Sequence, residues 1–162
     1  MARVAGAAVK PWIWLRSAAL LQALGTVGHT AATASTAPTH GPGERAVFDA
    51  MRGFHFEIMG FTRSIWDFYR GYQFSTTVTF VLLVAVLWLL SNLSRGAPQL
   101  ARPLVLALLI AQIATVIVSW TYFFAGPGVV GSAIALCLAM AARALPRESR
   151  ALAVHLASEG AD

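Results

Sequence analysis

The chain has 162 residues, of which 57% are hydrophobic and only 12% are charged. A soluble domain carries about 25% charged residues, so this composition excludes an ordinary soluble protein and indicates an integral membrane protein. The formal net charge is +5, but the basic residues do not gather in one soluble segment, which argues against a nucleic-acid-binding protein. The length fits a single membrane domain over residues 1–162.

The first predicted membrane span is Ser17–Ser35. Gln22, Gly25 and His29 fall on one face of this helix, as is typical of a helix whose polar side packs on partner helices. The stretch also resembles a secretory signal, because basic residues precede a short apolar core and Ala32–Ala34 offers small residues for cleavage. We expect a retained span, which makes the number of spans even; a cleaved signal is the alternative.

Residues 36–73 form the predicted outer loop, which begins with an irregular stretch rich in Pro, Gly, Ser and Thr. Apolar residues then recur at helical spacing and predict a short amphipathic helix on the outer surface or over the end of the bundle. These residues are Val47, Phe48, Met51, Phe54 and Ile58. Alternation within "FHFEIMGF" (Phe54–Phe61) leaves a strand as the alternative.

The stretch "RSIWDFYRGYQF" (Arg63–Phe74) places aromatic rings and charges together at the outer end of the next span. Tryptophan and tyrosine favour the membrane–water interface, which explains the rings. If the stretch is helical, Arg63 and Arg70 lie four and three residues from Asp67 and can clamp its carboxylate between two guanidinium groups. The alternative is a ligand-facing site, because ionisable groups at membrane depth are often functional.

Three further spans are predicted at Phe74–Leu93, Pro103–Phe124 and Gly128–Leu145, each close to the roughly 20 apolar residues that a membrane helix needs. The third span of the four carries polar residues that we expect to bond across helices: Gln112, Thr115, Ser119 and Tyr122. The fourth presents small residues that allow close helix packing: Gly128, Ser132, Ala135 and Ala139. The lone Cys137 cannot form an intrachain disulfide and is expected to be a small buried hydrophobe.

The basic residues divide unevenly between the two sides of this arrangement. Eight of the 12 Lys and Arg residues flank the spans on the side of the termini, whereas the outer loop holds four basic and four acidic residues. The positive-inside rule therefore predicts cytoplasmic N and C termini in the plasma membrane.

The sequence contains no phosphate loop, nucleophile elbow, zinc-protease helix or dinucleotide fingerprint. His29 has no second His, Cys or carboxylate at metal-ligand spacing, so no metal site is expected. No cofactor is indicated.

The pattern "GTVGH" (Gly25–His29), followed by Met51–Phe74, resembles an uncharacterised family of small bacterial four-helix integral membrane proteins with a "YWDFYxGFG"-like motif. Ile65 stands where that motif has Tyr, and "GYQF" (Gly71–Phe74) departs from its usual ending. The layout is also similar to DoxX-type proteins, some of which accompany quinone-linked oxidoreductases; this likeness is one of fold alone.

These observations predict an all-α, multi-pass membrane four-helix bundle with a polar cavity opening outward. We expect a small accessory subunit that binds a lipophilic ligand or a membrane-protein partner within the lipid bilayer. The alternative is a membrane-embedded oxidoreductase subunit or isomerase that uses His29 and Asp67 for proton transfer. The candidate ligand-binding residues are Gln22, His29, Glu57, Arg63, Trp66, Asp67, Tyr69, Arg70, Gln112 and Tyr122.

Overall fold

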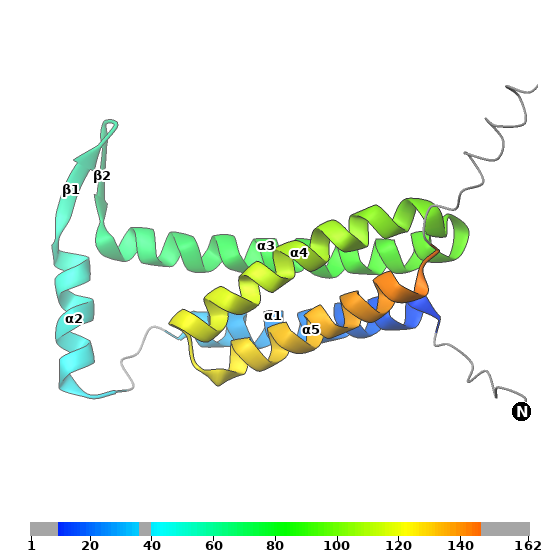
Figure 1. Cartoon of the computed structure of the whole chain (residues 1–162). Helices are drawn as coiled ribbons and strands as arrows, with labels where there is room; N and C mark the ends of the chain where they lie inside the picture. The colour runs from blue at the N-terminus through cyan, green and yellow to red at the C-terminus, as the bar shows by residue number, and fades with distance from the viewer. Residues whose placement is uncertain (1–9, 36–39, 147–162) are drawn as a thin grey trace, which may run out of the picture. The chain divides into compact units, whose positions relative to one another are not determined.

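The computed structural model describes residues 10–35 and 40–146, and helices account for 85% of these residues. The prediction of a mainly helical chain is therefore confirmed. Figure 1 shows the described elements in order, which are α1 (Pro11–Ala34), α2 (Pro42–Gly53), β1 (His55–Ile58), β2 (Phe61–Ser64), α3 (Ile65–Gly96), α4 (Pro98–Tyr122) and α5 (Ala125–Ala144).

Helices α3, α4 and α5 are each long and apolar enough to cross a membrane. They contain most of the predicted spans 74–93, 103–124 and 128–145. Many of their large apolar side chains are exposed, including Ile110 at 71% and Leu136 at 61%. Water would penalise this exposure, whereas lipid tails cover such side chains without cost. The chain is therefore a membrane protein.

Helix α1 covers most of the predicted first span and begins earlier, at Pro11. It is 24 residues long but is not among the three described helices that are apolar enough to cross a membrane. Gln22, His29 and several threonines lower its hydropathy. A bundle of four membrane-spanning helices therefore stays a prediction.

The chain divides into two compact units. Among the described residues, unit 1 contains residues 10–23 and 83–146, and unit 2 contains residues 24–35 and 40–82. Helices α1 and α3 contribute residues to both units.

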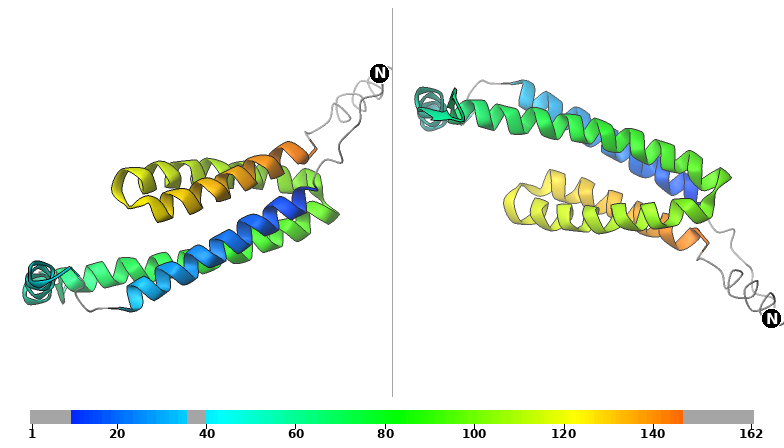
Figure 2. Two further views of the ribbon diagram at one scale, coloured as in Figure 1. Left: turned by 90° about the horizontal axis from the view of Figure 1, so that it is seen from below. Right: turned by 90° about the horizontal axis from the view of Figure 1, so that it is seen from above.

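Unit 1 holds the buried apolar core, in which Leu15, Val105 and Leu138 are almost completely enclosed. Figure 2 shows α4 and α5 lying side by side within this unit. Gln112 Nε2 donates to the carbonyl oxygen of Gly131 at 3.1 Å, so this side chain bonds across the two helices. Cys137 lies in the core, as predicted.

Unit 2 joins the end of α1 to the start of α3. The ring of His29 and the guanidinium of Arg70 both reach backbone carbonyl groups of the opposite helix. Three threonine hydroxyls on α3 instead donate to carbonyl groups four residues earlier in their own helix: Thr76, Thr77 and Thr79. These bonds satisfy hydroxyl groups without a partner from another helix.

The outer segment differs from the all-helical prediction. The amphipathic helix is present as α2, but it ends at Gly53, and the chain then forms the two antiparallel strands β1 and β2. The strand alternative for Phe54–Phe61 is the one adopted, because Met59 and Gly60 both take positive φ angles, 50° and 81°. Two consecutive residues with positive φ make the tight turn that suits a two-residue hairpin.

Replacing Gly128 by alanine tests the packing of α5 on α4. A Cβ atom at this position would lie 2.6 Å from the Trp120 ring, so the ring or the helix must move. We expect Gly128→Ala to lower the free energy of unfolding by about 1–3 kcal/mol, the usual cost of overpacking. Thermal unfolding in detergent measures the effect. The control is Gly96→Ala, where a Cβ would meet no atom within 4 Å; equal loss in both variants would contradict the packing argument.

Candidate functional site

The start of α3 is fixed by a reciprocal pair of side chains. The backbone N–H and the hydroxyl of Ser64 donate to Asp67 Oδ2 at 2.8 and 2.9 Å, and the Asp67 N–H donates to Ser64 Oγ at 3.2 Å. This arrangement is a capping box, which satisfies backbone donors that the first turn of a helix leaves unpaired. Ser64 was not among the predicted site residues, although the S-x-x-D pattern of "SIWD" (Ser64–Asp67) carries the signal.

The predicted clamp on Asp67 is wrong. Arg63 lies on β2 rather than on the helix, because Ser64 ends the strand and caps α3. Its guanidinium donates to the Thr62 carbonyl oxygen at 2.8 Å and lies 5.2 Å from the ring centre of Phe61. Among the residues that the structure describes, no ion pair involves Asp67.

Arg70 also bonds elsewhere. It donates to the Thr33 carbonyl oxygen at the end of α1 and to Gln73 Oε1, the latter at 3.0 Å. Gln73 in turn accepts a bond at its carbonyl oxygen from His29 Nε2, at 3.2 Å. Because a carbonyl oxygen can only accept, Nε2 is the donor in this bond. Gln73 therefore links His29 and Arg70, two of the predicted residues.

Asp67 lies in the first turn of α3, before the apolar stretch that starts at Phe74. The two bonds that Ser64 donates hold the pKa of this carboxyl group below its ordinary value of 3.8, and the positive charge of Arg63 acts in the same direction. Asp67 is therefore an ionised hydrogen-bond acceptor near neutral pH and is a poor general acid.

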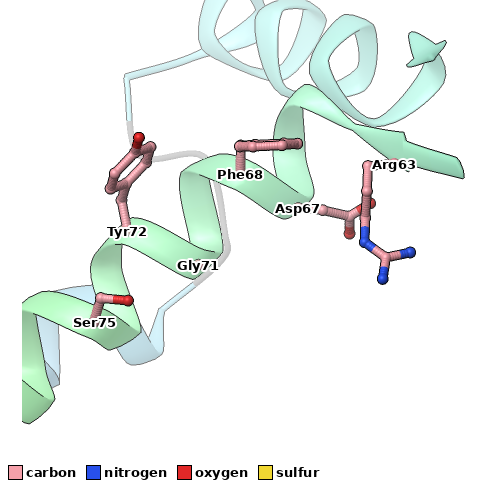
Figure 3. A pocket seen from close by; sticks show the side chains of 6 residues that line it. All are labelled: Arg63, Asp67, Phe68, Gly71, Tyr72 and Ser75. Carbon is pink, nitrogen blue, oxygen red and sulfur yellow. The ribbon is translucent and has the colours of Figure 1, made fainter. Parts of the chain in front are cut away.

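An open groove of about 320 Å³ runs along the first turns of α3. Figure 3 shows the side chains around it, which are Arg63, Asp67, Phe68, Gly71, Tyr72 and Ser75. Arg63 and Asp67 lie at one end, and Tyr72 and Ser75 lie at the other, next to the apolar stretch. Gly71 leaves the middle of the groove open, because no atom lies within 4 Å of the position of its missing Cβ.

The hairpin adds an apolar surface to this groove. Residues opposite each other in the register share a face, so Phe56, Ile58, Phe61 and Arg63 lie on one face of the hairpin. The Phe56 ring stacks on Phe68 of α3 with ring centres 5.6 Å apart. The apolar face of the hairpin and the groove of α3 therefore meet at Phe68. Glu57, a predicted site residue, pairs with Thr62 on the other face.

A smaller cavity of about 150 Å³ lies within unit 2. Three of the predicted site residues line it, all from α3: Trp66, Tyr69 and Arg70. The other lining residues are Ala32, Ser35, Glu44, Phe48 and Gln73. The Trp66 and Tyr69 ring centres lie 5.4 Å apart, and the Arg52 guanidinium lies 4.2 Å from the ring centre of Trp66. These contacts indicate that the side chains around the cavity serve mainly to pack α2 against α3.

The remaining predicted residues belong to unit 1. Gln22 is buried, Gln112 bonds to α5, and Tyr122 is 77% exposed at the end of α4. Within the described ranges, no group of three or more His, Cys, Asp or Glu side chains could hold a metal ion. The groove residues Gly71, Tyr72 and Ser75 were not predicted, because only the fold of the hairpin reveals which face of α3 is left open.

Comparisons of the chain with protein-family models, with characterised proteins and with solved structures found no match.

The capping box can be tested by removing either partner. We expect Ser64→Ala to lower the free energy of unfolding by about 1 kcal/mol, the typical cost of losing an N-cap, and to speed amide exchange in the first turn of α3. Asp67→Asn should be partly tolerated, because one acceptor oxygen remains, and Arg63→Gln should not rescue it. Thr62→Ala, on the exposed strand, is the control. Rescue of Asp67→Asn by Arg63→Gln would contradict the capping box and support the clamp of Asp67 by arginines instead.

The lowered pKa of Asp67 predicts a pH dependence. A carboxylate with a depressed pKa contributes its full stabilisation above its unfolded pKa and loses it as the pH falls through the folded pKa. We therefore expect the amide proton shift of Ser64, followed by NMR, to change with a midpoint below 3.8. The same shift should not titrate in Asp67→Asn. A midpoint at or above 3.8 would contradict the bonding described above.

Proposed function

We propose that this protein is a small multi-pass accessory subunit that binds a lipophilic ligand along the groove of α3. The observation that carries this proposal is the continuity of the groove with the apolar face of the hairpin, through the stacked rings of Phe56 and Phe68. The groove and the hairpin face together offer aromatic and aliphatic side chains, with Arg63 and Asp67 as charged groups at one end of the groove.

The lining of the groove suggests the kind of ligand. Ligand pockets are mostly apolar and carry a few polar groups that fix orientation. Here the Arg63 guanidinium and the Asp67 carboxylate lie at the end that is further from the apolar stretch of α3. An amphiphile with a hydrogen-bonding head at Arg63 and an apolar tail along Phe68 and Tyr72 matches this order.

The proposal includes four membrane spans, with α1 as the first, in the plasma membrane. Cytoplasmic N and C termini follow from the excess of basic residues on their side and from the neutral outer loop. Four-helix layouts of this type include the DoxX-like proteins that the sequence resembles, which supports an accessory role by analogy of layout only.

An enzyme that uses His29 and Asp67 is the weaker candidate. His29 bonds to the Gln73 carbonyl oxygen and lies edge-on to Phe80 with ring centres 5.3 Å apart. Asp67 is engaged by Ser64. The two side chains therefore have separate structural partners, and proton transfer between them has no contact to support it.

Filling the groove tests the proposed binding site. Gly71→Leu places a bulky side chain in open space, so the fold should persist while the groove is blocked. We expect native mass spectrometry of protein purified in mild detergent to show a bound lipophilic molecule in the wild type, with at least about tenfold lower occupancy in Gly71→Leu. Gly43→Leu, also in open space but on α2, is the control. Equal occupancy in all three proteins would reject the groove.

The proposed topology has its own test. A reporter that is active only outside the cytoplasm should give no signal when it is fused to the C terminus. The same reporter inserted directly after Gly41 should be active. Activity at the C terminus would contradict the four-span arrangement and favour a cleaved first segment or an inverted chain.

A further inference from the structure

Two arginines share one indole ring in unit 1. The Arg95 guanidinium lies 4.1 Å from the ring centre of Trp12, and the Arg16 guanidinium lies 5.2 Å from the same ring and 4.8 Å from that of Trp88. Ser91 Oγ donates to the Trp12 carbonyl oxygen at 3.3 Å, which ties the start of α1 to α3. We name Trp12, Arg16, Trp88 and Arg95 the arginine–tryptophan cluster.

No carboxylate balances these charges within the described part of unit 1. Residues 10–23 and 83–146 contain five basic side chains and no Asp or Glu; the basic side chains are Lys10, Arg16, Arg95, Arg102 and Arg143. The face of an indole ring attracts a cation, but it accepts none of the in-plane hydrogen bonds that a guanidinium donates. Two like charges on one ring also repel each other. Among the residues that the structure describes in unit 1, the cluster therefore has no anionic partner.

Buried guanidinium atoms in unit 1 support this view. The Nε atoms of Arg16 and Arg102 are buried and have no hydrogen-bond partner within residues 10–35 and 40–146. Buried polar groups are normally paired, and charged ones most of all. Arg102 follows the short turn from α3 to α4, seven positions after Arg95 in the sequence, so it lies near the same ends of these helices.

The position of the cluster along the helices indicates the source of the anion. Trp12 and Arg16 lie in the first turns of α1, and Arg95 lies in the last turn of α3, one of the helices that can cross a membrane. The ends of membrane helices lie at the level of the lipid headgroups, where tryptophan is enriched. The abundant anion at this depth is the phosphate of a phospholipid, and guanidinium groups bind phosphate through two parallel hydrogen bonds.

We propose that the arginine–tryptophan cluster binds the phosphate of an anionic phospholipid, with the two guanidinium groups as its donors. The phosphate lies between Arg16 and Arg95 and relieves their repulsion, while the indole rings of Trp12 and Trp88 hold both guanidinium groups in place. Arg102 and Lys10 add positive charge at the same level. The cluster shares no residue with the groove of α3.

The test compares the binding of an anionic and a zwitterionic phospholipid to the full chain. Delipidated protein in detergent is titrated with phosphatidylglycerol or with phosphatidylcholine, and lipid binding is followed by native mass spectrometry and by Trp fluorescence. We expect the wild type to bind phosphatidylglycerol at least about tenfold more tightly than phosphatidylcholine, and added salt should reduce the difference. Arg16→Gln and Arg95→Gln should each remove most of it.

Two further variants make the result specific. Arg52→Gln removes the same charge from a guanidinium that also lies over a tryptophan ring but has a carboxylate partner in Asp49, so it should keep the preference. Arg95 is exposed, so Arg95→Lys should fold. This variant retains the charge but loses the paired donors of the guanidinium, and we expect it to lose part of the preference for phosphatidylglycerol.

The remaining outcomes would overturn the proposal. Equal binding of the two lipids by the wild type would show that no anionic lipid is preferred. A preference that survives in both Arg16→Gln and Arg95→Gln would place the site elsewhere. If millimolar inorganic phosphate abolished the preference, the ligand would be a soluble phosphate. If replacement of Glu148, Glu159 and Asp162 by their amides were needed to reveal lipid binding, the anion would come from the chain itself.

Discussion

Lipid tails offer no hydrogen-bond partner, and most of this structure follows from that constraint. In α3, α4 and α5, backbone groups bond within their own helix while large apolar side chains face outward. The polar side chains obey the same rule. The hydroxyls of Thr76, Thr77 and Thr79 bond to earlier carbonyl groups of α3, and Gln112 bonds to α5. Strands and tight turns occur in unit 2, in the segment that precedes the apolar part of α3.

The two units deal with positive charge in different ways. All the Asp and Glu side chains that the structure describes lie in unit 2. There, arginines meet carbonyl oxygens, amides and carboxylates, as Arg70 and Arg52 show. In the described part of unit 1, arginines meet only aromatic rings among the contacts seen. A ring stabilises a cation at close range but accepts none of its in-plane hydrogen bonds, and this difference between the units is the basis of the proposed phosphate site.

Hydropathy was sufficient to predict the helical fold and three apolar helices, because these depend on composition over about 20 residues. The secondary structure of the outer segment was harder to predict. Its apolar residues fit both helical spacing and alternation, and the backbone at Met59 and Gly60 decided between them. Charge spacing failed at Asp67 for a related reason: a capping serine placed Arg63 on a strand, and the i, i+4 relationship no longer applied. Of the residues that line the groove, Arg63 and Asp67 were found from sequence. Phe68, Gly71, Tyr72 and Ser75 were not, because they depend on which face of α3 stays open.

The turn of the hairpin has a chemical consequence. Met59 is 94% exposed and adopts a φ of 50°, a conformation that side chains other than Gly, Asn and Asp rarely take. Its thioether is therefore fully open to peroxide and other oxidants. Conversion to the sulfoxide would turn the most exposed apolar side chain of the hairpin into a polar one without disturbing any buried contact. The apolar face of Phe56, Ile58 and Phe61 would then end in a polar tip, and a reductase could restore the thioether.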